Sequence, residues 1–152
     1  MYDQLKLENQ ICFRLYTASR LVTRAYHPYF EPLGITYPQY LVLLVLWQQD
    51  NLPVSEITSR LCLDTNTVTP LLQRMERDGL LVRTRSAVDS RQRIVSLTKK
   101  GRKLQEAAKD IPSCVGQQIA DNMSSVDELI QLSATLDHLI DTLKKQQHNP
   151  TT

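Results

Sequence analysis

Glycine is scarce in this sequence of 152 residues, with only four copies, while leucine, glutamine, arginine and threonine are plentiful. That balance favours helices over a fold rich in strands or loops. Long apolar runs are also missing, since the longest, residues 40–47, has 8 residues and a membrane-spanning helix needs ~20. The N-terminus lacks the basic and then apolar pattern of a secretory signal. We therefore expect a cytoplasmic protein with no membrane partner.

Cysteine is also rare, with three widely spaced copies at Cys12, Cys62 and Cys114. This is neither a disulfide framework nor a zinc-binding pattern. The three histidines form no ligand cluster with them (His27, His138 and His148). We expect no metal and no other cofactor, and three free thiols that are either buried or reactive.

The net charge of +2 hides an asymmetry along the chain. Residues 60–103 contain eleven Lys and Arg against four acids, a net charge of +7, which leaves −5 for the rest. A central basic segment between acidic ends indicates a surface for a polyanion such as nucleic acid. A solvated basic face without a partner is the alternative.

Apolar spacing predicts helices over residues 5–27, from Thr36 through the apolar segment 40–47, over 54–62, from residue 64 or 65 to 77 or 78, from Thr98 onward, and over 126–145. Two short strands, 80–85 and 93–97, are joined by the polar segment 86–92. A helix, a short turn, a second helix and a two-stranded hairpin make a winged helix-turn-helix. The fold class is therefore mainly α with a small β-hairpin wing, in one domain that spans residues 1–152.

The second helix of this motif exposes short polar side chains near its start, which suit reading of base edges in the major groove. Arginines at the tip of the hairpin suit the negative minor groove, and Asp89 is expected to hold one of them in place. An ordinary polar hairpin is the alternative. The candidate DNA-binding residues are Thr65, Asn66, Thr67, Thr69, Gln73, Arg74, Arg77, Arg85, Asp89, Arg91 and Arg93.

The segment RLCLDTNTVTPLLQRMERDGLLVRTRSAVDSRQRIVSLTKKG, residues 60–101, resembles the MarR family of winged-helix regulators. The resemblance implies an intertwined homodimer, with residues 5–30 and 110–146 as dimerisation helices and residues 36–100 as the DNA-binding lobe. It also implies two recognition helices that enter successive major grooves of a pseudo-palindromic, double-stranded operator. We thus expect a transcriptional regulator that acts as a repressor, and not an enzyme.

The segments LENQICFRLYTASRLVTRAY and ITYPQYLVLLVLW resemble the organic hydroperoxide resistance regulators within that family. The resemblance implies that organic hydroperoxides oxidise Cys12, to which Tyr26 and Tyr37 donate hydrogen bonds, and Tyr16 also has a counterpart. Cys12 and Tyr16 share one helix face. Tyr26 lies 14 positions after Cys12, or about 21 Å along a helix, so its contact is expected across the dimer or from a bent segment.

The remaining alternatives concern the thiols and the signal. Cys12 on a helix is also compatible with a small core residue. Cys114 is a candidate resolving cysteine, forming a disulfide with Cys12 of the other subunit, or an incidental thiol. Cys62 is expected on the apolar side, as a structural residue, with a secondary redox site as the alternative. A MarR-type regulator that binds a phenolic ligand non-covalently, and a thiol peroxidase, are the two other functions considered.

Overall fold

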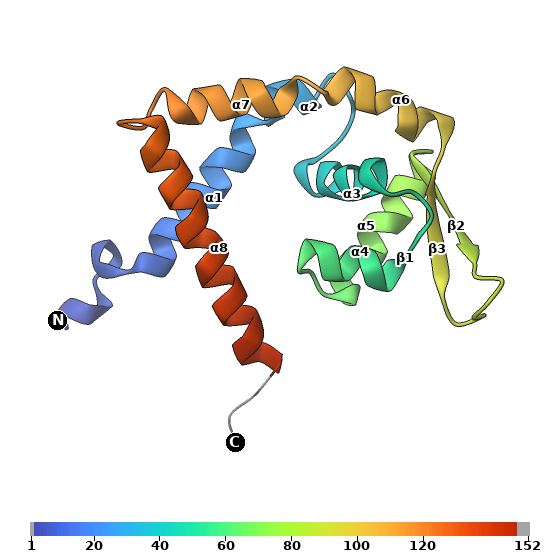
Figure 1. The fold of residues 1–152 in the computed structure, drawn as a ribbon, viewed down its shortest axis with the longest axis horizontal. Helices are drawn as coiled ribbons and strands as arrows, with labels where there is room; N and C mark the ends of the chain where they lie inside the picture. The colour runs from blue at the N-terminus through green and yellow to red at the C-terminus, as the bar shows by residue number, and fades with distance from the viewer. Residues whose placement is uncertain (1, 149–152) are drawn as a thin grey trace. The chain divides into compact units, whose positions relative to one another are not determined.

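The computed structural model describes residues 2–148, which form two compact units divided after Ile111. The first unit contains a winged helix-turn-helix with an N-terminal helical segment, and the second contains two helices (Figure 1). The elements of the first unit are α1 (Ile11–Ala25), α2 (His27–Phe30), α3 (Tyr37–Gln48), β1 (Leu52–Pro53), α4 (Val54–Leu61), α5 (Thr65–Arg77), β2 (Leu81–Arg85), β3 (Arg93–Leu97) and α6 (Lys99–Ala108). Two helices follow, α7 (Ile111–Ala120) and α8 (Val126–His148).

Helix α3 is the centre of the first unit, as its apolar sequence predicts. Val42, Leu43 and Leu46 are fully buried, and the helix is apolar on every side. Thr36 is its N-cap and forms a capping box with Gln39, whose side-chain oxygen accepts a hydrogen bond from the Thr36 N–H at 3.0 Å. Pro38 is tolerated in the first turn because that position has no helical N–H partner. The sequence-based prediction of this helix is confirmed.

Helices α4 and α5 form the helix-turn-helix beside α3. Asp64 is the N-cap of α5, and its carbonyl accepts from the N–H groups of Thr67 and Val68. The face formed by Val68, Leu71, Leu72 and Met75 is buried, as its i, i+3, i+4, i+7 spacing predicts.

The expectation for Cys62 is wrong. This residue is exposed and caps the C-terminus of α4 in the left-handed conformation, with φ of 54°. A helix commonly ends in this conformation, and the carbonyl groups of the last turn then accept the N–H groups of Cys62 and Leu63. The reversal of the backbone turns the Cys62 side chain out of the apolar face that simple helical periodicity assigns to it.

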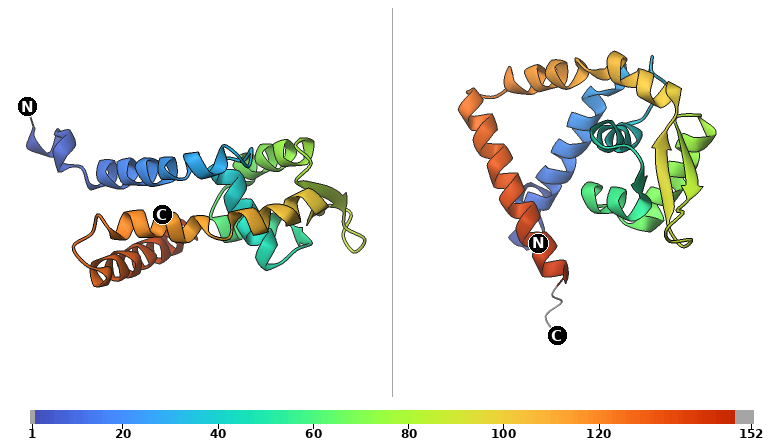
Figure 2. Two further views of the ribbon diagram at one scale, coloured as in Figure 1. Left: turned by 90° about the horizontal axis from the view of Figure 1, so that it is seen from above. Right: turned by 45° about the vertical axis from the view of Figure 1, so that its right-hand side comes forward.

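The wing is a three-stranded antiparallel sheet with strand order β1-β3-β2. Strands β2 and β3 pair in the register Leu81↔Leu97 to Arg85↔Arg93, as expected for the hairpin. Strand β1 was not expected, because two residues, one of them Pro53, give no alternating pattern. Two further views show how the β2–β3 hairpin extends beyond the helices of its own unit (Figure 2).

Helix α6 is fixed against α3 and the sheet at one close approach. A Cβ atom on Gly101 would lie 2.2 Å from the carbonyl oxygen of Leu80, so only glycine fits there. The carbonyl of Gly101 accepts a hydrogen bond from the indole N–H of Trp47 at 3.0 Å. Thr98 caps α6 by accepting from the Gly101 N–H. This packing holds the end of β3 close to α3.

The N-terminal segment begins its α-helix later than the expected residue 5. Residues Asp3–Leu5 and Leu7–Asn9 form two 3-10 turns, and α1 starts at Ile11. Side chains cause the interruption, because the amides of Asn9 and Gln10 donate to the carbonyls of Asp3 and Gln4 and so compete with helical hydrogen bonds. None of the residues of α1 is buried.

Helix α8 in the second unit also presents apolar side chains to solvent. Leu132, Ile140 and Leu143 are exposed, at 44–48% of their full area. Within residues 2–148, no helix is long and apolar enough to cross a membrane.

Asp50 generates a prediction about stability and its pH dependence. One carboxylate oxygen accepts from the N–H groups of Asn51 and Leu97, and the other from the Arg102 guanidinium at 2.7 Å. Burial opposes ionisation, but these hydrogen bonds outweigh it and lower the pKa of Asp50. Asp50→Ala should therefore cost about 1–3 kcal/mol at pH 7, since it leaves the Leu97 N–H without its acceptor.

Urea unfolding at several pH values measures this cost. Because the pKa of Asp50 is lower in the folded state, its stabilisation is present above the unfolded value of about 3.9 and is lost as the pH falls through the folded value. The difference between wild type and Asp50→Ala should shrink in acid. Asp110→Ala, at an exposed carboxylate, is the control, and an equal effect of both substitutions would contradict the assignment.

Candidate functional site

The outer face of α5 carries the polar residues that the sequence assigned to DNA. The face is exposed opposite the buried apolar side of the helix, and only Thr69 is half-buried. Short hydroxyl and amide groups lie at the helix start, and longer side chains lie further along. The exposed residues of this face are Thr65, Asn66, Thr67, Gln73, Arg74 and Arg77.

The wing adds three exposed arginines, Arg85, Arg91 and Arg93, at the β2–β3 hairpin. Asp89 does not hold one of their guanidinium groups as expected. Its carboxylate accepts instead from the backbone N–H of Arg91 at 3.0 Å, while the Ser86 hydroxyl oxygen accepts from the N–H of Asp89. These local hydrogen bonds shape the hairpin turn.

Sequence reasoning missed the ion pair that joins the wing to α5. The carboxylate of Glu76 accepts from the backbone N–H of Arg83 and twice from its guanidinium, at 2.8–3.1 Å. These hydrogen bonds lower the pKa of Glu76. The sequence shows opposite charges seven positions apart. Their contact could not be predicted from it, because it depends on the geometry of the turn between α5 and β2. The pair fixes α5 and the wing relative to each other.

Four aromatic side chains meet where α1, α2 and α3 approach one another. The rings of Tyr26 and Tyr37 lie edge to face, 5.0 Å between centroids, and Phe30 and Tyr40 lie 4.8 Å apart. Tyr26 is the C-cap of α1, and Tyr37 is the first residue of α3. The fold thus brings together two tyrosines that lie in separate helices.

The environment of this aromatic cluster (Tyr26, Phe30, Tyr37 and Tyr40) keeps its phenols protonated. Burial raises the pKa of Tyr26, and the nearby Tyr37 phenolate adds to that shift. Burial also raises the pKa of Tyr37, and it raises that of Tyr40 to about 12. The phenol O–H groups therefore stay available as hydrogen-bond donors through neutral and mildly alkaline pH.

Cys12 lies on the first turn of α1 and is exposed. Its apolar neighbours do not close over it in the single chain, since Ile11, Phe13 and Leu15 are themselves 38–65% exposed. Tyr16, one turn further on, is 63% exposed, and its ring lies 5.1 Å from the Arg20 guanidinium. The chain therefore provides the thiol and the Tyr26–Tyr37 pair at opposite ends of α1.

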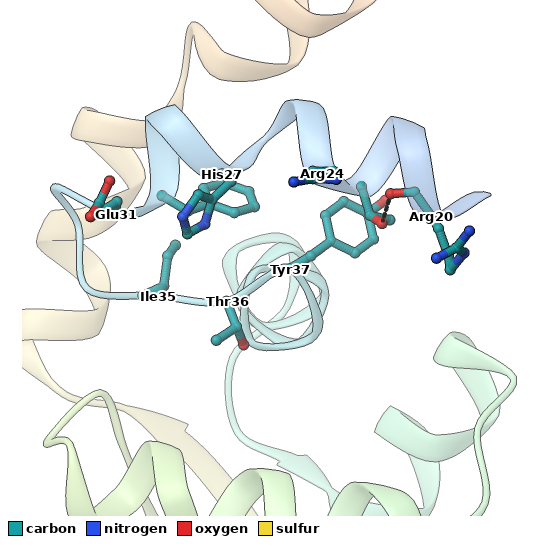
Figure 3. A pocket seen from close by; sticks show the side chains of 9 residues that line it. Arg20, Arg24, His27, Glu31, Ile35, Thr36 and Tyr37 are labelled. Carbon is teal, nitrogen blue, oxygen red and sulfur yellow. Dashed lines mark hydrogen bonds between the residues drawn. The ribbon is translucent and has the colours of Figure 1, made fainter. Parts of the chain in front are cut away.

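An open pocket of about 550 Å³ lies beside Tyr37 (Figure 3). Arg20, Arg24 and His27 from α1 and α2 face it together with apolar Phe30 and Ile35. Glu31 is the one acid among its lining residues. The pocket thus joins cationic and apolar groups next to one of the candidate sensor tyrosines.

Cys114 is exposed on α7, in the second unit. Cys12 belongs to the first unit, and each thiol is free. Among the described residues, no group of three or more His, Cys, Asp or Glu side chains is placed to share a metal ion.

Comparison with known proteins identifies the family. The MarR family model matches residues 35–92. The organic hydroperoxide resistance transcriptional regulator of Bacillus subtilis (strain 168) is 44% identical over 145 residues, which cover 95% of this chain and 97% of that protein.

Solved structures of AbfR, a protein of Staphylococcus epidermidis, share the fold. Reduced AbfR bound to DNA is 39% identical with a TM-score of 0.69, and the match covers 91% of this chain and 98% of that one. Disulfide-formed AbfR is 38% identical with a TM-score of 0.63, over 91% and 95% of the two chains. The chain belongs to the MarR family of DNA-binding transcriptional regulators.

Proposed function

We propose that this protein is a homodimeric repressor that releases its operator when an organic hydroperoxide oxidises Cys12. The observation that carries the proposal is the joining of Tyr26 and Tyr37 into one cluster of protonated phenols beside an open pocket. The similarity to the hydroperoxide resistance regulator of Bacillus subtilis supports the choice of signal.

The dimer follows from the uncovered apolar faces. Helix α1 buries none of its residues, and exposed leucines and isoleucines continue along α8. A single chain of this size rarely leaves so much apolar surface in water. Within one chain, the length of the helix separates Cys12 from Tyr26 by about 21 Å. A second copy that covers these faces brings the Cys12 of one chain to the tyrosine cluster of the other.

The DNA-binding surface consists of the α5 face and the wing. In a symmetric dimer, two copies of α5 enter successive major grooves, about 34 Å apart, on a pseudo-palindromic duplex. The short side chains at the start of α5 read base edges, and Gln73, Arg74 and Arg77 reach bases or phosphates. The arginines of the wing enter the adjacent minor groove. The DNA-bound structure of AbfR, a relative over nearly the whole chain, supports this assignment.

The signalling chemistry is a two-electron oxidation of sulfur. Phenol donors from Tyr26 and Tyr37 stabilise the Cys12 thiolate, which attacks one peroxide oxygen. The O–O bond breaks, the other oxygen leaves as an alkoxide that takes a proton from solvent to become the alcohol, and the sulfur becomes a sulfenic acid. Condensation with the Cys114 thiol of the other subunit then forms a disulfide and releases water. The relative AbfR has a disulfide form, which supports this second step.

The pocket favours one alternative signal, a phenolic acid bound without covalent chemistry. Its arginines and His27 suit a carboxylate, and Phe30 and Ile35 suit an aromatic ring. Mass spectrometry after exposure to peroxide separates the two functions, because only the redox model adds oxygen or a disulfide at Cys12. A thiol peroxidase would instead turn over repeatedly with a thiol reductant, and the relatives found are regulators.

Replacement of Cys12 tests the redox model directly. The probe is a duplex selected from a random-sequence library by the reduced wild-type protein, and the signal is cumene hydroperoxide. Wild type should release this duplex on oxidation, whereas Cys12→Ser should bind it equally well and stay bound. Cys62→Ser, at the other exposed thiol of the first unit, is the control and should respond like wild type. Equal release of wild type and Cys12→Ser would overturn the redox model.

Replacement of Tyr37 tests the role of the phenol donors. Loss of one hydrogen bond to a charged sulfur should slow Cys12 oxidation about tenfold in Tyr37→Phe, because such a bond stabilises the thiolate by about 1.5 kcal/mol. Stopped-flow oxidation with cumene hydroperoxide measures the rate. Since burial raises the pKa of Tyr37, the effect should persist from pH 7 to pH 9. Tyr2→Phe, at an exposed tyrosine, is the control, and an unchanged rate in Tyr37→Phe would remove Tyr37 from the site.

Cys114 is tested by crosslinking. Wild type exposed to cumene hydroperoxide should run as a covalent dimer on a non-reducing gel and return to monomer with dithiothreitol. Cys114→Ala should lose the crosslink and accumulate sulfenic acid at Cys12. A full crosslink in Cys114→Ala would show that another thiol resolves the intermediate.

A further inference from the structure

Gln39 is the one buried polar side chain in the part of the chain that the structure describes, at 5% exposed. It lies two positions after Tyr37, in the first turn of α3. Its side-chain oxygen accepts the N–H of Thr36, and the Thr36 side chain in turn accepts the N–H of Gln39. The start of α3, and with it Tyr37, is therefore held by the Gln39 amide.

The chemistry of this hydrogen bond fixes the orientation of the amide. A backbone N–H can only donate, so the oxygen of Gln39 must face Thr36 and its nitrogen must face away. The nitrogen donates to the carboxylate of Asp78, 3.4 Å away and 39 positions along the chain. The oxygen of the Gln39 amide thus accepts one hydrogen bond, and its nitrogen donates another.

Asp78 is the C-cap of the recognition helix α5. Its carbonyl accepts from the ammonium of Lys100 at the start of α6, at 2.8 Å. A single buried amide therefore joins the segment that carries the sensor tyrosine to the end of the helix that carries the DNA-reading face. Within residues 2–148, the hydrogen bond from Gln39 to Asp78 is the direct link from α3 to the α5 cap.

We propose that Gln39 is a positioning residue that couples the Tyr37 end of α3 to the recognition helix through Asp78. The inference rests on the proposed function, in which Tyr37 donates a hydrogen bond to the Cys12 thiolate, because oxidation removes the thiolate that accepts this bond. A shift at the first turn of α3 then moves the Gln39 amide, and the hydrogen bond to Asp78 passes the displacement to α5. Breaking that hydrogen bond uncouples oxidation from DNA release without altering Cys12. The Asp78 carboxylate also lies 3.8 Å from the Arg77 guanidinium, so a variant that loses only the charge of Asp78 is needed as a control.

The test compares two substitutions at Asp78, which is exposed and so tolerates replacement without loss of the fold. Asp78→Ala removes the acceptor, whereas Asp78→Asn keeps a side-chain oxygen for the Gln39 amide. The readout is the ratio of oxidised to reduced Kd for the selected duplex, with cumene hydroperoxide as the oxidant. Asp78→Ala should lower this ratio about fivefold, because one hydrogen bond of about 1 kcal/mol carries the coupling. Asp78→Asn should keep the ratio within about twofold of wild type.

Gln39→Met tests the link from its other end. If both residues act through one hydrogen bond, the Gln39→Met/Asp78→Ala double variant should lower the ratio no further than Asp78→Ala alone. The rate of Cys12 oxidation, followed by mass spectrometry, should equal that of wild type in every Asp78 variant. A role in stability alone would change the melting temperature and leave the Kd ratio as in wild type, and that result overturns the inference.

The two proposals fail in different ways. If wild type itself keeps the duplex after complete oxidation of Cys12, the proposed function is wrong. If wild type releases the duplex and Asp78→Ala releases it equally, or if Asp78→Asn loses coupling as fully as Asp78→Ala, the coupling through Gln39 is wrong. Asp110→Ala serves as the control for removal of an exposed carboxylate.

Discussion

Burial of the apolar helix α3 is the constraint on which the rest of the winged helix-turn-helix depends. A helix without a polar face has to be covered, and here α4, α5 and α6 pack against it. The same helix provides fixed polar anchors at its two ends. Gln39 at its start reaches the cap of α5, and Trp47 near its end holds the carbonyl of Gly101 in α6. A movement of α3 therefore cannot stay local, because densely packed interiors transmit strain.

The α5 face and the wing, to which we assign DNA binding, are joined by side chains outside the candidate DNA-binding set. The Glu76–Arg83 pair ties the back of the recognition helix to the first strand of the wing, while Asp50 ties the end of α3 to the last strand and to α6. The α5 face and the hairpin arginines consequently keep one spacing, as the readout of adjacent grooves that we propose requires. The residues that we propose for sensing differ in this respect, because Tyr26 and Tyr37 are packed together but Cys12 lies on an uncovered helix. The chemistry we propose is complete only when a second chain covers that helix.

Much of the fold could be predicted from the sequence because its signals are local. The apolar face of α5, the cap at Thr36 and the hairpin depend on residues within a few positions of each other. The failures have equally physical causes. Side-chain amides at Asn9 and Gln10 delay α1, the left-handed backbone at Cys62 turns that thiol outward, and strand β1 is too short to show a period. Each is a contact or a backbone angle that hydrophobic periodicity does not encode.

The sequence by itself determined the winged helix-turn-helix, the basic segment and the resemblance that singled out Cys12, Tyr26 and Tyr37. Only the tertiary structure decided which of these residues meet, since contact between distant positions depends on how helices pack. It placed Tyr26 against Tyr37 and left Cys12 exposed. It also revealed the Glu76–Arg83 pair and the buried Gln39 amide, whose partner lies 39 positions away. Hydrophobic periodicity does not predict a hydrogen bond between such distant positions. The packing of α3 brings the two partners together, and the neighbouring residues in the sequence do not.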